Sequence, residues 1–449
     1  MTRPPLPAGP FLVVGLARSG EAAAVALSAR GEEVIGTDAG AGDRPDLAAV
    51  ASRLRAAGVE VHMDASGEAL AARAGTLIKS PGVPQSAPLV RAARARGIPV
   101  IGELELAWRL LPNEFLAVTG TNGKTTTSEW IGHIHRTARV PVAVAGNVGT
   151  ALSSLVSKLP LDVTVVCEAS SFQLEDADQF APEIAVLLNL TPDHLDRHGS
   201  YDAYMQAKQR IFARQDAAKI AVLPDDLDLE PAGDAVQLRF GESPSSALRL
   251  RDGELRWRGQ PLLPESEIPL PGAHNVQNAM AAATVCLARE LPLEAVAEGL
   301  RTFAGVPHRL ELVGVRHGVR YINDSKATNV DSTLVALRSF PGRIHLILGG
   351  KGKAQDFGPL ASLVSERCTA VYLIGEAAGE IAGALAGAVV PLIPAGDLER
   401  AVAIAALEAR DGAVVLLSPA CASFDQYRDY EARGDHFRAL ALGLAEGSD

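Results

Sequence analysis

The segment GTNGKTTT at residues 120–127 constrains the fold of this chain most strongly. An apolar run at 115–118 precedes it and an apolar, helix-forming stretch at 130–134 follows it. This order predicts a strand, a tight glycine turn and a helix, in which backbone N–H groups and the helix N-terminus converge on phosphate oxygens. Lys124 is then placed to reach the β- and γ-phosphates, and the Thr125 hydroxyl to bind Mg²⁺.

The match to the general phosphate-loop pattern is partial. That pattern has a glycine five residues before Gly123, where this chain has Val118. A glycine turn between strand and helix that binds no ligand is therefore the alternative reading of this segment.

Composition narrows the class of protein. A length of 449 residues suggests about three domains. With 47% hydrophobic and 21% charged residues, the chain reads as a soluble globular protein rich in helices packed on parallel strands. A net charge of -11 argues against a nucleic-acid-binding surface. The four cysteines lack metal-ligand spacing, and neither a signal peptide nor an apolar run of 18 residues is present, so we expect a cytoplasmic protein without membrane insertion.

Strand-like and helix-like segments alternate in three blocks, which predicts an α/β protein of three domains. We expect a Rossmann-like domain at 1–102, a central P-loop domain with a parallel sheet at 103–305, and a Rossmann-like domain at 306–449. Central strands are expected at 115–119, 142–145, 163–167, 184–190 and 219–223, with a small β excursion at 235–265 and a long helix after Pro271-Gly272. In the third block, strands are expected near 319–323, 343–348, 370–374 and 413–417, together with a glycine turn at 349–353.

The first block has the layout of a nucleotide-binding βαβ unit. A glycine turn at 15–20 follows a strand, and Asp38 ends the next strand about 20 residues on. Ala17 replaces the middle glycine of the dinucleotide fingerprint, which disfavours NAD and leaves an ordinary α/β turn as the alternative. A second loop, 80–84, follows a strand at 76–79 and should lie at the ligand-binding edge of this sheet.

Polar side chains follow the central strands. Asn147 follows one strand, Glu168 another, and Asp193 and His194 a third, with Lys208 in the helical segment beyond. Parallel strands bring such residues to the same sheet edge as the phosphate loop. Glu168 and His194 are then candidate ligands of a divalent cation. The structural alternatives are a helix-capping role for Glu168, an ordinary loop histidine at 194 and a solvated lysine at 208.

Several segments together resemble the Mur ligases of peptidoglycan precursor synthesis. They are GTNGKTTT, ExSSFQL, LNLTPDHLDRHG, YxxYxxxK, PGAHNVQNAMAA, PHRLE, NDSKATN and SPACASFDQYRDYEARG, in this order over nearly the whole chain. The last segment resembles the branch of the family that adds D-glutamate to UDP-N-acetylmuramoyl-L-alanine. The Asp-Asn-Pro-Arg signature of the branch that adds a diamino acid is absent, and folylpolyglutamate synthases share the phosphate loop without this tail.

The resemblance implies ATP-dependent amide formation, with ADP and phosphate as products. The substrate carboxylate attacks the γ-phosphate to give an acyl phosphate, and the incoming amine then displaces phosphate. This chemistry needs neutralised charge, aligned reactants and exclusion of water.

The resemblance also implies a role for individual residues. One Mg²⁺ would be held by Thr125 and Glu168, and a second by His194 and a carbamylated Lys208. The catalytic set would comprise Lys124, Asn147, Asp193, His194 and Lys208. ATP would contact Gly120, Thr121, Asn122, Gly123, Lys124, Thr125, Thr126, Asn278, Arg309 and Asp324.

The implied substrate contacts divide among the three blocks. The UDP part would contact Gly15, Ser19, Gly20, Asp38, Ser80 and Gly82. Asn147, Ser170 and Gln173 would line the path between nucleotide and carboxylate. The incoming amino acid would contact Lys326, Thr328, Lys353, Ser423, Phe424 and Tyr430, where the family often has Phe in place of Tyr430. Lys351, in the same glycine turn as Lys353, also differs from the acid-containing version of that loop.

Two alternatives stay open at this stage. One is a ligase on the same scaffold that uses a different amino acid, such as L-glutamate, because a sequence does not show the chirality of a pocket. The other is a non-catalytic nucleotide-binding protein. The presence of Lys124, Glu168, His194 and Lys208 together argues against the second alternative. We expect a monomer.

Overall fold

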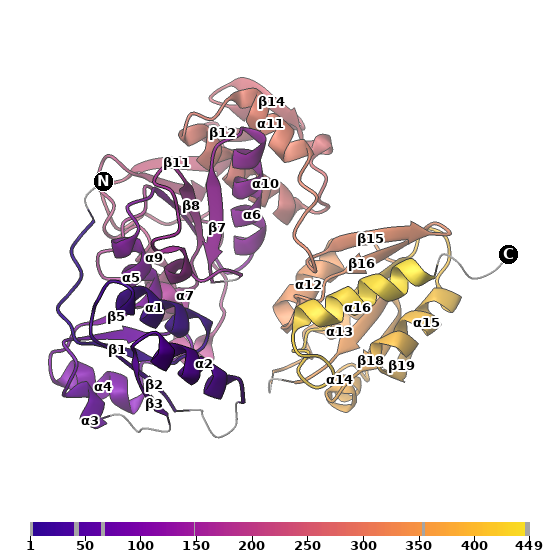
Figure 1. Ribbon diagram of the computed structural model, residues 1–449. Helices are drawn as coiled ribbons and strands as arrows, with labels where there is room; N and C mark the ends of the chain where they lie inside the picture. Colours follow the sequence, from indigo (N-terminus) through magenta and orange to yellow (C-terminus); the bar gives the residue numbers. More distant parts are fainter. Residues whose placement is uncertain (1–2, 40–44, 64–67, 148, 353–354, 445–449) are drawn as a thin grey trace. The chain divides into compact units, whose positions relative to one another are not determined.

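The computed structural model describes residues 3–39, 45–63, 68–147, 149–352 and 355–444. The chain divides into two compact units (Figure 1). Unit 1 comprises residues 1–269 with 276–303, and unit 2 comprises residues 270–275 with 304–449.

Unit 1 begins with a five-stranded parallel sheet in the order β3-β2-β1-β4-β5. Buried apolar strands of this kind suit a parallel sheet covered by helices on both faces. Its strands are β1 (Phe11–Val14), β2 (Val34–Asp38), β3 (Glu60–Met63), β4 (Thr76–Lys79) and β5 (Val100–Gly102). Its helices are α1 (Arg18–Ser28), α2 (Pro45–Ala56), α3 (Glu68–Ala71), α4 (Pro88–Ala95) and α5 (Glu103–Leu110).

The second sheet of unit 1 has nine strands in the order β14-β13-β12-β11-β10-β9-β6-β8-β7. The strands are parallel from β7 to β12, whereas β12, β13 and β14 form an antiparallel meander at one edge. The strands are β6 (Phe115–Thr119), β7 (Val142–Gly146), β8 (Thr164–Glu168), β9 (Ile184–Leu187), β10 (Ile220–Pro224), β11 (Val236–Gly241), β12 (Leu248–Arg251), β13 (Glu254–Trp257) and β14 (Gln260–Pro264).

Short and long helices follow these strands. They are α6 (Lys124–Thr137), the 3₁₀ turn η2 (Leu152–Leu155), α7 (Ser171–Leu174), α8 (Leu195–His198), α9 (Tyr201–Gln209), the 3₁₀ turn η3 (Glu265–Glu267), α10 (Ala273–Ala288) and α11 (Leu293–Arg301). Because β6 lies between β8 and β9, the turn after β6 sits where the strand order reverses. Ligands bind at such a point in open α/β sheets.

Unit 2 holds a six-stranded sheet in the order β15-β16-β20-β17-β18-β19, with only β15 antiparallel to its neighbour. Its strands are β15 (Glu311–Arg316), β16 (Val319–Asn323), β17 (Ile344–Gly349), β18 (Cys368–Ile374), β19 (Leu392–Gly396) and β20 (Val414–Leu417). Its helices are α12 (Val330–Arg338), α13 (Leu360–Arg367), α14 (Ala378–Ala384), α15 (Leu398–Glu408) and α16 (Tyr430–Gly443).

Strand alternation explains why this sheet is covered on both faces. In β17, Leu346 and Leu348 pack with residues of α12, α13 and α14, whereas Ile347 packs with residues of α15 and α16. Successive side chains of a strand point to opposite faces, so a fully apolar strand needs helices on both.

The predicted α/β class is confirmed, and every strand that the sequence predicted is present. The strand expected at 184–190 ends at Leu187, so that Asn189 belongs to the following loop. The β excursion expected at 235–265 is present as β11 to β14, and these strands continue the central sheet. The domain boundaries at 102/103 and 305/306 remain a prediction.

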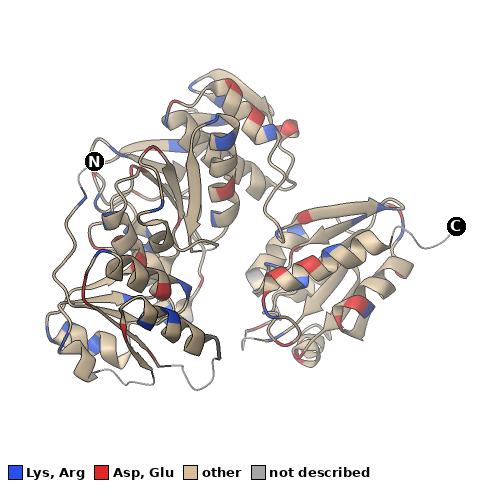
Figure 2. Ribbon diagram, in the orientation of Figure 1, with Lys and Arg blue, Asp and Glu red and all other residues tan. Residues whose placement is uncertain are grey.

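Charged residues of both signs are scattered over both units (Figure 2). Among the helices in the described ranges, none is long and apolar enough to cross a membrane.

Candidate active site

The phosphate loop has the geometry that its sequence predicts. It joins β6 to α6, and Gly123 begins the helix with a left-handed φ of 85°. A Cβ at Gly123 would lie 2.2 Å from Asn278 Oδ1, so only glycine lets α10 approach the loop here. Asn278 Oδ1 also accepts a hydrogen bond from the Thr127 hydroxyl at 3.3 Å. The predicted nucleotide residue Asn278 therefore packs directly on the phosphate loop.

The loop after β9 holds the phosphate loop in place. Asn189 and Asn122 form a reciprocal pair, in which Asn122 N donates to Asn189 Oδ1 at 2.9 Å and Asn189 Nδ2 donates to Asn122 O at 3.1 Å. The Thr121 hydroxyl donates to Thr191 O at 3.1 Å and lies 2.9 Å from the Tyr204 hydroxyl. This support pre-organises the loop, which reduces the conformational entropy lost when a phosphate binds.

Two lysines meet at the Gly120 carbonyl. Lys124 Nζ donates to Gly120 O at 3.0 Å and to Thr121 O at 2.9 Å, and Lys208 Nζ donates to Gly120 O at 2.7 Å. Lys208 is only 1% exposed, so the solvated-surface reading of this residue is wrong. Burial and the neighbouring Lys124 ammonium lower the pKa of Lys208 well below its usual value. A neutral, nucleophilic amine is the form of lysine that reacts with CO₂ to give a carbamate.

Residues at the ends of β7 and β8 are joined to each other. Asn147 Nδ2 donates to Glu168 Oε1 at 3.0 Å, and Asn147 N donates to Glu168 O at 2.9 Å. Gly146 permits this approach, because a Cβ there would lie 2.2 Å from Glu168 O. Asn147 is exposed and Glu168 is buried at the carboxyl edge of the sheet.

Ser170 and Gln173 have a clear structural role. They form a reciprocal capping box at the start of α7, where Gln173 N donates to Ser170 Oγ and Ser170 N donates to Gln173 Oε1. Ser170, and not Glu168, is thus the cap of this helix. Their predicted contact with the substrate path is compatible with this position, since Gln173 also lines the cavity described below.

His194 lies on the loop that precedes α8. It has a left-handed φ of 52°, and its ring packs at 4.8 Å between centroids on Phe172. Asp193 accepts a hydrogen bond from His194 N at 2.8 Å and lies 3.4 Å from His194 Nε2. The His194 side chain is 46% exposed, so it is accessible to a ligand.

Only some of the donor groups near the phosphate loop are ligands that Mg²⁺ prefers. The Thr125 hydroxyl and the Glu168 carboxylate supply hard oxygen donors, as Mg²⁺ requires. An unmodified Lys208 amine does not fit a hard cation, whereas a carbamate would offer oxygens. In the part of the chain that the structure describes, no cluster of three or more His, Cys, Asp or Glu side chains is arranged to hold a metal ion.

A cavity of about 610 Å³ lies within unit 1. Its wall combines the glycine turn after β1, the end of β2, the loop after β4 and the end of β7. The predicted substrate residues on this wall are Gly15, Ser19, Asp38, Ser80, Gly82, Asn147 and Gln173. The structure therefore brings residues that are more than 150 positions apart into one site.

The glycine turn itself is fixed by Asp38 and Ser80. Leu16 N donates to Asp38 Oδ2 at 2.7 Å, and the Ser80 hydroxyl donates to Gly15 O at 2.6 Å. Gly20 lies beneath the turn, where a Cβ would be 1.8 Å from Gly15 O. Gly20 thus allows close packing of α1 under the turn, whereas Asp38 and Ser80 shape the cavity.

Lys79 and Arg197 hold the loop at 80–84 in place through hydrogen bonds to its carbonyls. Lys79 Nζ forms a buried ion pair with Asp176 Oδ2 at 2.8 Å and donates to Val83 O at 2.8 Å. Arg197, three residues after His194, donates to Pro81 O at 2.5 Å and to Val83 O at 2.9 Å. These contacts connect the cavity wall to the segment that carries His194.

Unit 2 contains the remaining predicted nucleotide residues. Asp324 is buried, accepts hydrogen bonds from the Ser418 hydroxyl at 2.8 Å and from Leu310 N at 3.2 Å, and follows β16. Burial raises the pKa of Asp324 to about 7, and the Arg309 guanidinium opposes this shift. Arg309 and Asp324 therefore lie close enough to interact electrostatically.

The predicted amino-acid residues lie on two loops and one helix start in unit 2. Lys326 and Thr328 follow β16, Ser423 and Phe424 follow β20, and Tyr430 begins α16. Lys326 Nζ lies 5.8 Å from the centre of the Tyr430 ring. Ser423 is buried and Phe424 is 67% exposed. Lys353 lies outside the described residues.

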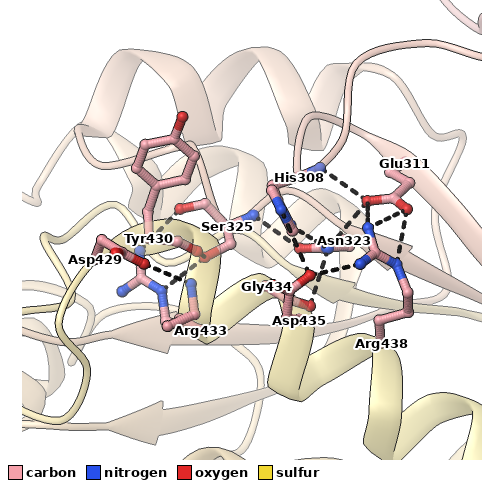
Figure 3. A network of polar contacts seen from close by, with 11 residues as sticks. His308, Glu311, Asn323, Ser325, Asp429, Tyr430, Arg433, Gly434, Asp435 and Arg438 are labelled. Atoms are coloured by element: carbon pink, nitrogen blue, oxygen red, sulfur yellow. Dashed lines mark hydrogen bonds and ion pairs between the residues drawn. The ribbon is translucent and has the colours of Figure 1, made fainter. Parts of the chain in front are cut away.

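A network of polar contacts surrounds these loops (Figure 3). Asn323 Nδ2 lies 3.0 Å from His308 Nδ1 and donates to Glu311 Oε2 and Gly434 O, both at 3.1 Å. Arg438 in turn binds the Glu311 carboxylate with two nitrogens. This network ties the segment before β15 to α16.

Sequence reasoning assigned no role to several residues that support the site. Asn189, Tyr204, Arg197 and Arg433 fall inside the motifs quoted above, whereas Lys79 and Asp176 do not. The motifs could have indicated a role for the first four residues. The residues that they contact are distant in sequence and come near only in the folded chain.

Two models of one family match this chain. The Mur ligase middle domain matches residues 118–286, and the Mur ligase glutamate ligase domain matches residues 308–421. The chain is 46% identical over 447 residues to the UDP-N-acetylmuramoylalanine–D-glutamate ligase of Acidobacterium capsulatum, covering 96% of this chain and 95% of that protein. It is 42% identical to the enzyme of the same name from Anaeromyxobacter dehalogenans, covering 99% and 100%.

Solved structures show the same fold at lower identity. The UDP-N-acetylmuramate–alanine ligase of Thermotoga maritima has a TM-score of 0.60 at 20% identity, over 97% of this chain and all of that one. The MurF ligase of Thermotoga maritima in complex with ADP has a TM-score of 0.58 at 20% identity, over 84% and 91%. The two family models and the relatives at 42–46% identity over nearly the full length show that the chain belongs to the Mur ligase family.

Proposed function

We propose that the chain joins D-glutamate to UDP-N-acetylmuramoyl-L-alanine at the expense of ATP, in peptidoglycan precursor synthesis. The observation that carries this proposal is identity of 41–46% over nearly the full length of several relatives named UDP-N-acetylmuramoylalanine–D-glutamate ligase. The contacts of Lys124 and Lys208 with the Gly120 carbonyl support the phosphoryl-transfer part of it. As in the family, the protein is an ATP-dependent ligase.

The cavity of unit 1 is the proposed site for the UDP-sugar substrate. Its glycine turn offers backbone N–H groups to phosphate, and Asp38 is an acceptor for hydroxyl or base N–H groups. Asn147 and Gln173 on the same wall lie toward the end of the sheet that carries the phosphate loop. In the proposed complex, the substrate carboxylate would face the γ-phosphate, and the two reactants would be aligned.

In the first step, a carboxylate oxygen forms a bond to the γ-phosphorus as the bond to the β-phosphate bridging oxygen breaks, and ADP leaves. Two anions must approach one another for this to occur. Lys124, which donates to the Gly120 and Thr121 carbonyls of the phosphate loop, would neutralise the phosphate oxygens.

Magnesium is proposed at two places. Thr125 and Glu168 would hold one ion, and His194 with a carbamylated Lys208 the other. When bound, the ions neutralise charge on the phosphates and polarise the reacting phosphoryl group. Asn147 donates to the Glu168 carboxylate, and Asp193 accepts from the His194 backbone N–H and lies 3.4 Å from His194 Nε2.

In the second step, the amine of D-glutamate attacks the acyl carbon, the amine loses a proton, and phosphate leaves. Lys326, Thr328, Lys353, Ser423, Phe424 and Tyr430 of unit 2 are proposed to bind this amino acid. Cations and hydroxyls match its two carboxylates. Asn278, Arg309 and Asp324 are proposed to bind the nucleotide. We expect the protein to act as a cytoplasmic monomer.

The test is turnover of UDP-N-acetylmuramoyl-L-alanine with ATP, Mg²⁺ and a panel of amino acids, measured as phosphate release and as formation of the ligated product. D-Glutamate should support both, whereas L-glutamate and meso-diaminopimelate should support neither. Turnover with another member of the panel in place of D-glutamate would transfer the proposal to that amino acid. ATP binding without turnover of any amino acid would leave only the non-catalytic alternative.

A further inference from the structure

Arg433 is a fully buried arginine in the second turn of α16, at 1% exposure. Its guanidinium makes four hydrogen bonds, two to Ser325 and two to the loop after β20. Nε donates to Ser325 Oγ at 2.9 Å and Nη2 to Ser325 O at 2.9 Å, while Nη2 also donates to Cys421 O at 3.1 Å and Nη1 to Ala422 O at 3.3 Å. Figure 3 shows this side chain beside Ser325 and Tyr430.

These contacts join the segments that carry the proposed amino-acid ligands. Ser325 immediately precedes Lys326, and Ala422 immediately precedes Ser423. The Ser325 hydroxyl, which accepts from Arg433, donates to Tyr430 O at 2.8 Å. One side chain thus fixes the loop after β16, the loop after β20 and the first residue of α16.

The glycine turn after β17 also contacts the Ala422 carbonyl. Ala422 O accepts from Lys351 N at 2.9 Å as well as from Arg433. Gly350 allows this contact, because a Cβ there would lie 2.3 Å from Ala422 O and 3.1 Å from Arg433 Nη1. The glycine turn after β17 is therefore also held through the Ala422 carbonyl.

The four hydrogen bonds of the Arg433 guanidinium all end on neutral oxygens, which belong to carbonyl or hydroxyl groups. Burial lowers the pKa of Arg433 to about 10, while Asp425 and Asp324 are among the groups that oppose the shift. The guanidinium consequently stays cationic at neutral pH. A cation in a low-dielectric interior attracts an anionic ligand more strongly than the same charge in water.

We propose that Arg433 is a positioning residue for the incoming amino acid, which sets the geometry of the loops that bind it and supplies positive charge behind them. This inference rests on the proposed function, because it takes unit 2 as the binding site of a dicarboxylic amino acid. Arg433, a buried residue of the motif at 418–434, would thus contribute to affinity for the incoming amino acid as well as to folding.

The first test compares Arg433→Lys and Arg433→Gln with the wild type under saturating co-substrates. Lysine keeps the charge and loses the fork of donors, whereas glutamine loses both. The KM for D-glutamate should rise about tenfold in R433K and further in R433Q, as expected for loss of hydrogen bonds that involve a charged group. The KM for the UDP-sugar should change less than about twofold, since its proposed site lies in unit 1. The KM for ATP should rise less than that for D-glutamate, because of the proposed nucleotide residues only Asp324 lies on a loop that Arg433 contacts.

Arg410→Lys is the matched control. Arg410 also lies in unit 2, is exposed, and donates to the carbonyls of Leu407 and Ala409 at the end of α15. This variant should keep all three KM values. Unchanged KM for D-glutamate in folded R433K, or an equal rise in all three KM values, would overturn the proposal.

Ser325→Ala keeps the proposal testable if the Arg433 variants do not fold, as judged by circular dichroism and thermal unfolding. It removes the hydroxyl that links Arg433 to Tyr430 and leaves the arginine in place. A selective rise in the KM for D-glutamate supports the proposal, and an unchanged KM contradicts it. Failure of the proposed function is separate, because the wild type would then show no turnover with D-glutamate.

Discussion

The environment of Lys208 in the structure differs from the one that its sequence pattern indicates. A lysine in an amphipathic helix is ordinarily solvated, yet this amine is buried and directed at the carbonyl that Lys124 also contacts. Burial of an ammonium beside a second ammonium is costly, so the neutral amine is favoured. The modification proposed at this position follows from that environment together with the family resemblance.

Lys208→Ala should lower kcat by about 10²–10⁴-fold, because it removes a fixed group at the site of charge development. Small carboxylates such as acetate should restore part of the activity, since they can take the place of the carbamate oxygens. Phosphate release with and without acetate measures both effects. Lys219→Ala is the control, because Lys219 is also in unit 1 and its Nζ donates to Ala181 O instead of to the phosphate loop. Full activity of Lys208→Ala would contradict the carbamate.

The raised pKa of Asp324 predicts that the stability of the fold depends on pH. Its pKa is raised from 3.8 to about 7 in the folded protein. The folded state therefore holds a proton that the unfolded chain has lost between these values, and this group's contribution to stability falls as pH rises through about 7. Asp324→Asn should remove that fall, so the variant should gain stability relative to the wild type as pH increases from 5 to 8. Urea unfolding at each pH tests this, and a difference that is constant with pH would contradict it.

At the scale of elements, a pair of buried charges connects the two sheets of unit 1. Lys79 ends β4, and Asp176 follows α7, with side chains 0% and 2% exposed. Gln85 Nε2 donates to Asp176 Oδ1 at 2.8 Å, and Gly102 N donates to Asp176 O at 3.0 Å. Asp176 thus joins the end of β4, the loop after β4 and the end of β5.

Removal of Asp176 should be strongly destabilising, because it leaves a buried ammonium without its partner. Asp176→Ala should cost about 3–5 kcal/mol in the free energy of unfolding. Lys79→Met with Asp176→Leu should cost less than the sum of the single changes, since neither charge is then left alone. As a control, Glu267→Ala removes an exposed partner of Arg301 and should cost less than about 1 kcal/mol. Equal costs for Asp176→Ala and Glu267→Ala would show that burial does not matter here.

Sequence patterns predicted the central elements of each sheet better than their edges. Buried strands such as β6, β8 and β17 are continuous apolar runs and were found near their true bounds. The edge strands β15 and β19 were not predicted, because β15 alternates partly exposed residues and β19 contains Pro394. Residues of the site were predicted where they end a strand, whereas Asn189, Arg197 and Arg433 depend on partners that only the topology brings near.

For the whole molecule, the proposed binding residues divide between the two compact units. Unit 1 contains the cavity with Asp38 and the phosphate loop, and unit 2 contains the loops around Ser423. Substitutions in separate sites with no shared partner usually have additive effects. The affinities for the UDP-sugar and for D-glutamate should therefore be separable by mutation.

Ser423→Ala should raise the KM for D-glutamate, because a carboxylate that loses a charge-assisted hydrogen bond forfeits about 1.5–3 kcal/mol, or about ten- to a hundredfold in affinity. The KM values for ATP and the UDP-sugar should change little. Asp38→Ala should have the opposite pattern, since it removes the acceptor that fixes the glycine turn through Leu16 N. The double variant should combine the two losses in kcat/KM, measured for each substrate with the others saturating. If Ser423→Ala instead weakened ATP and spared D-glutamate, the amino-acid pocket would have to be sought outside the loop after β20.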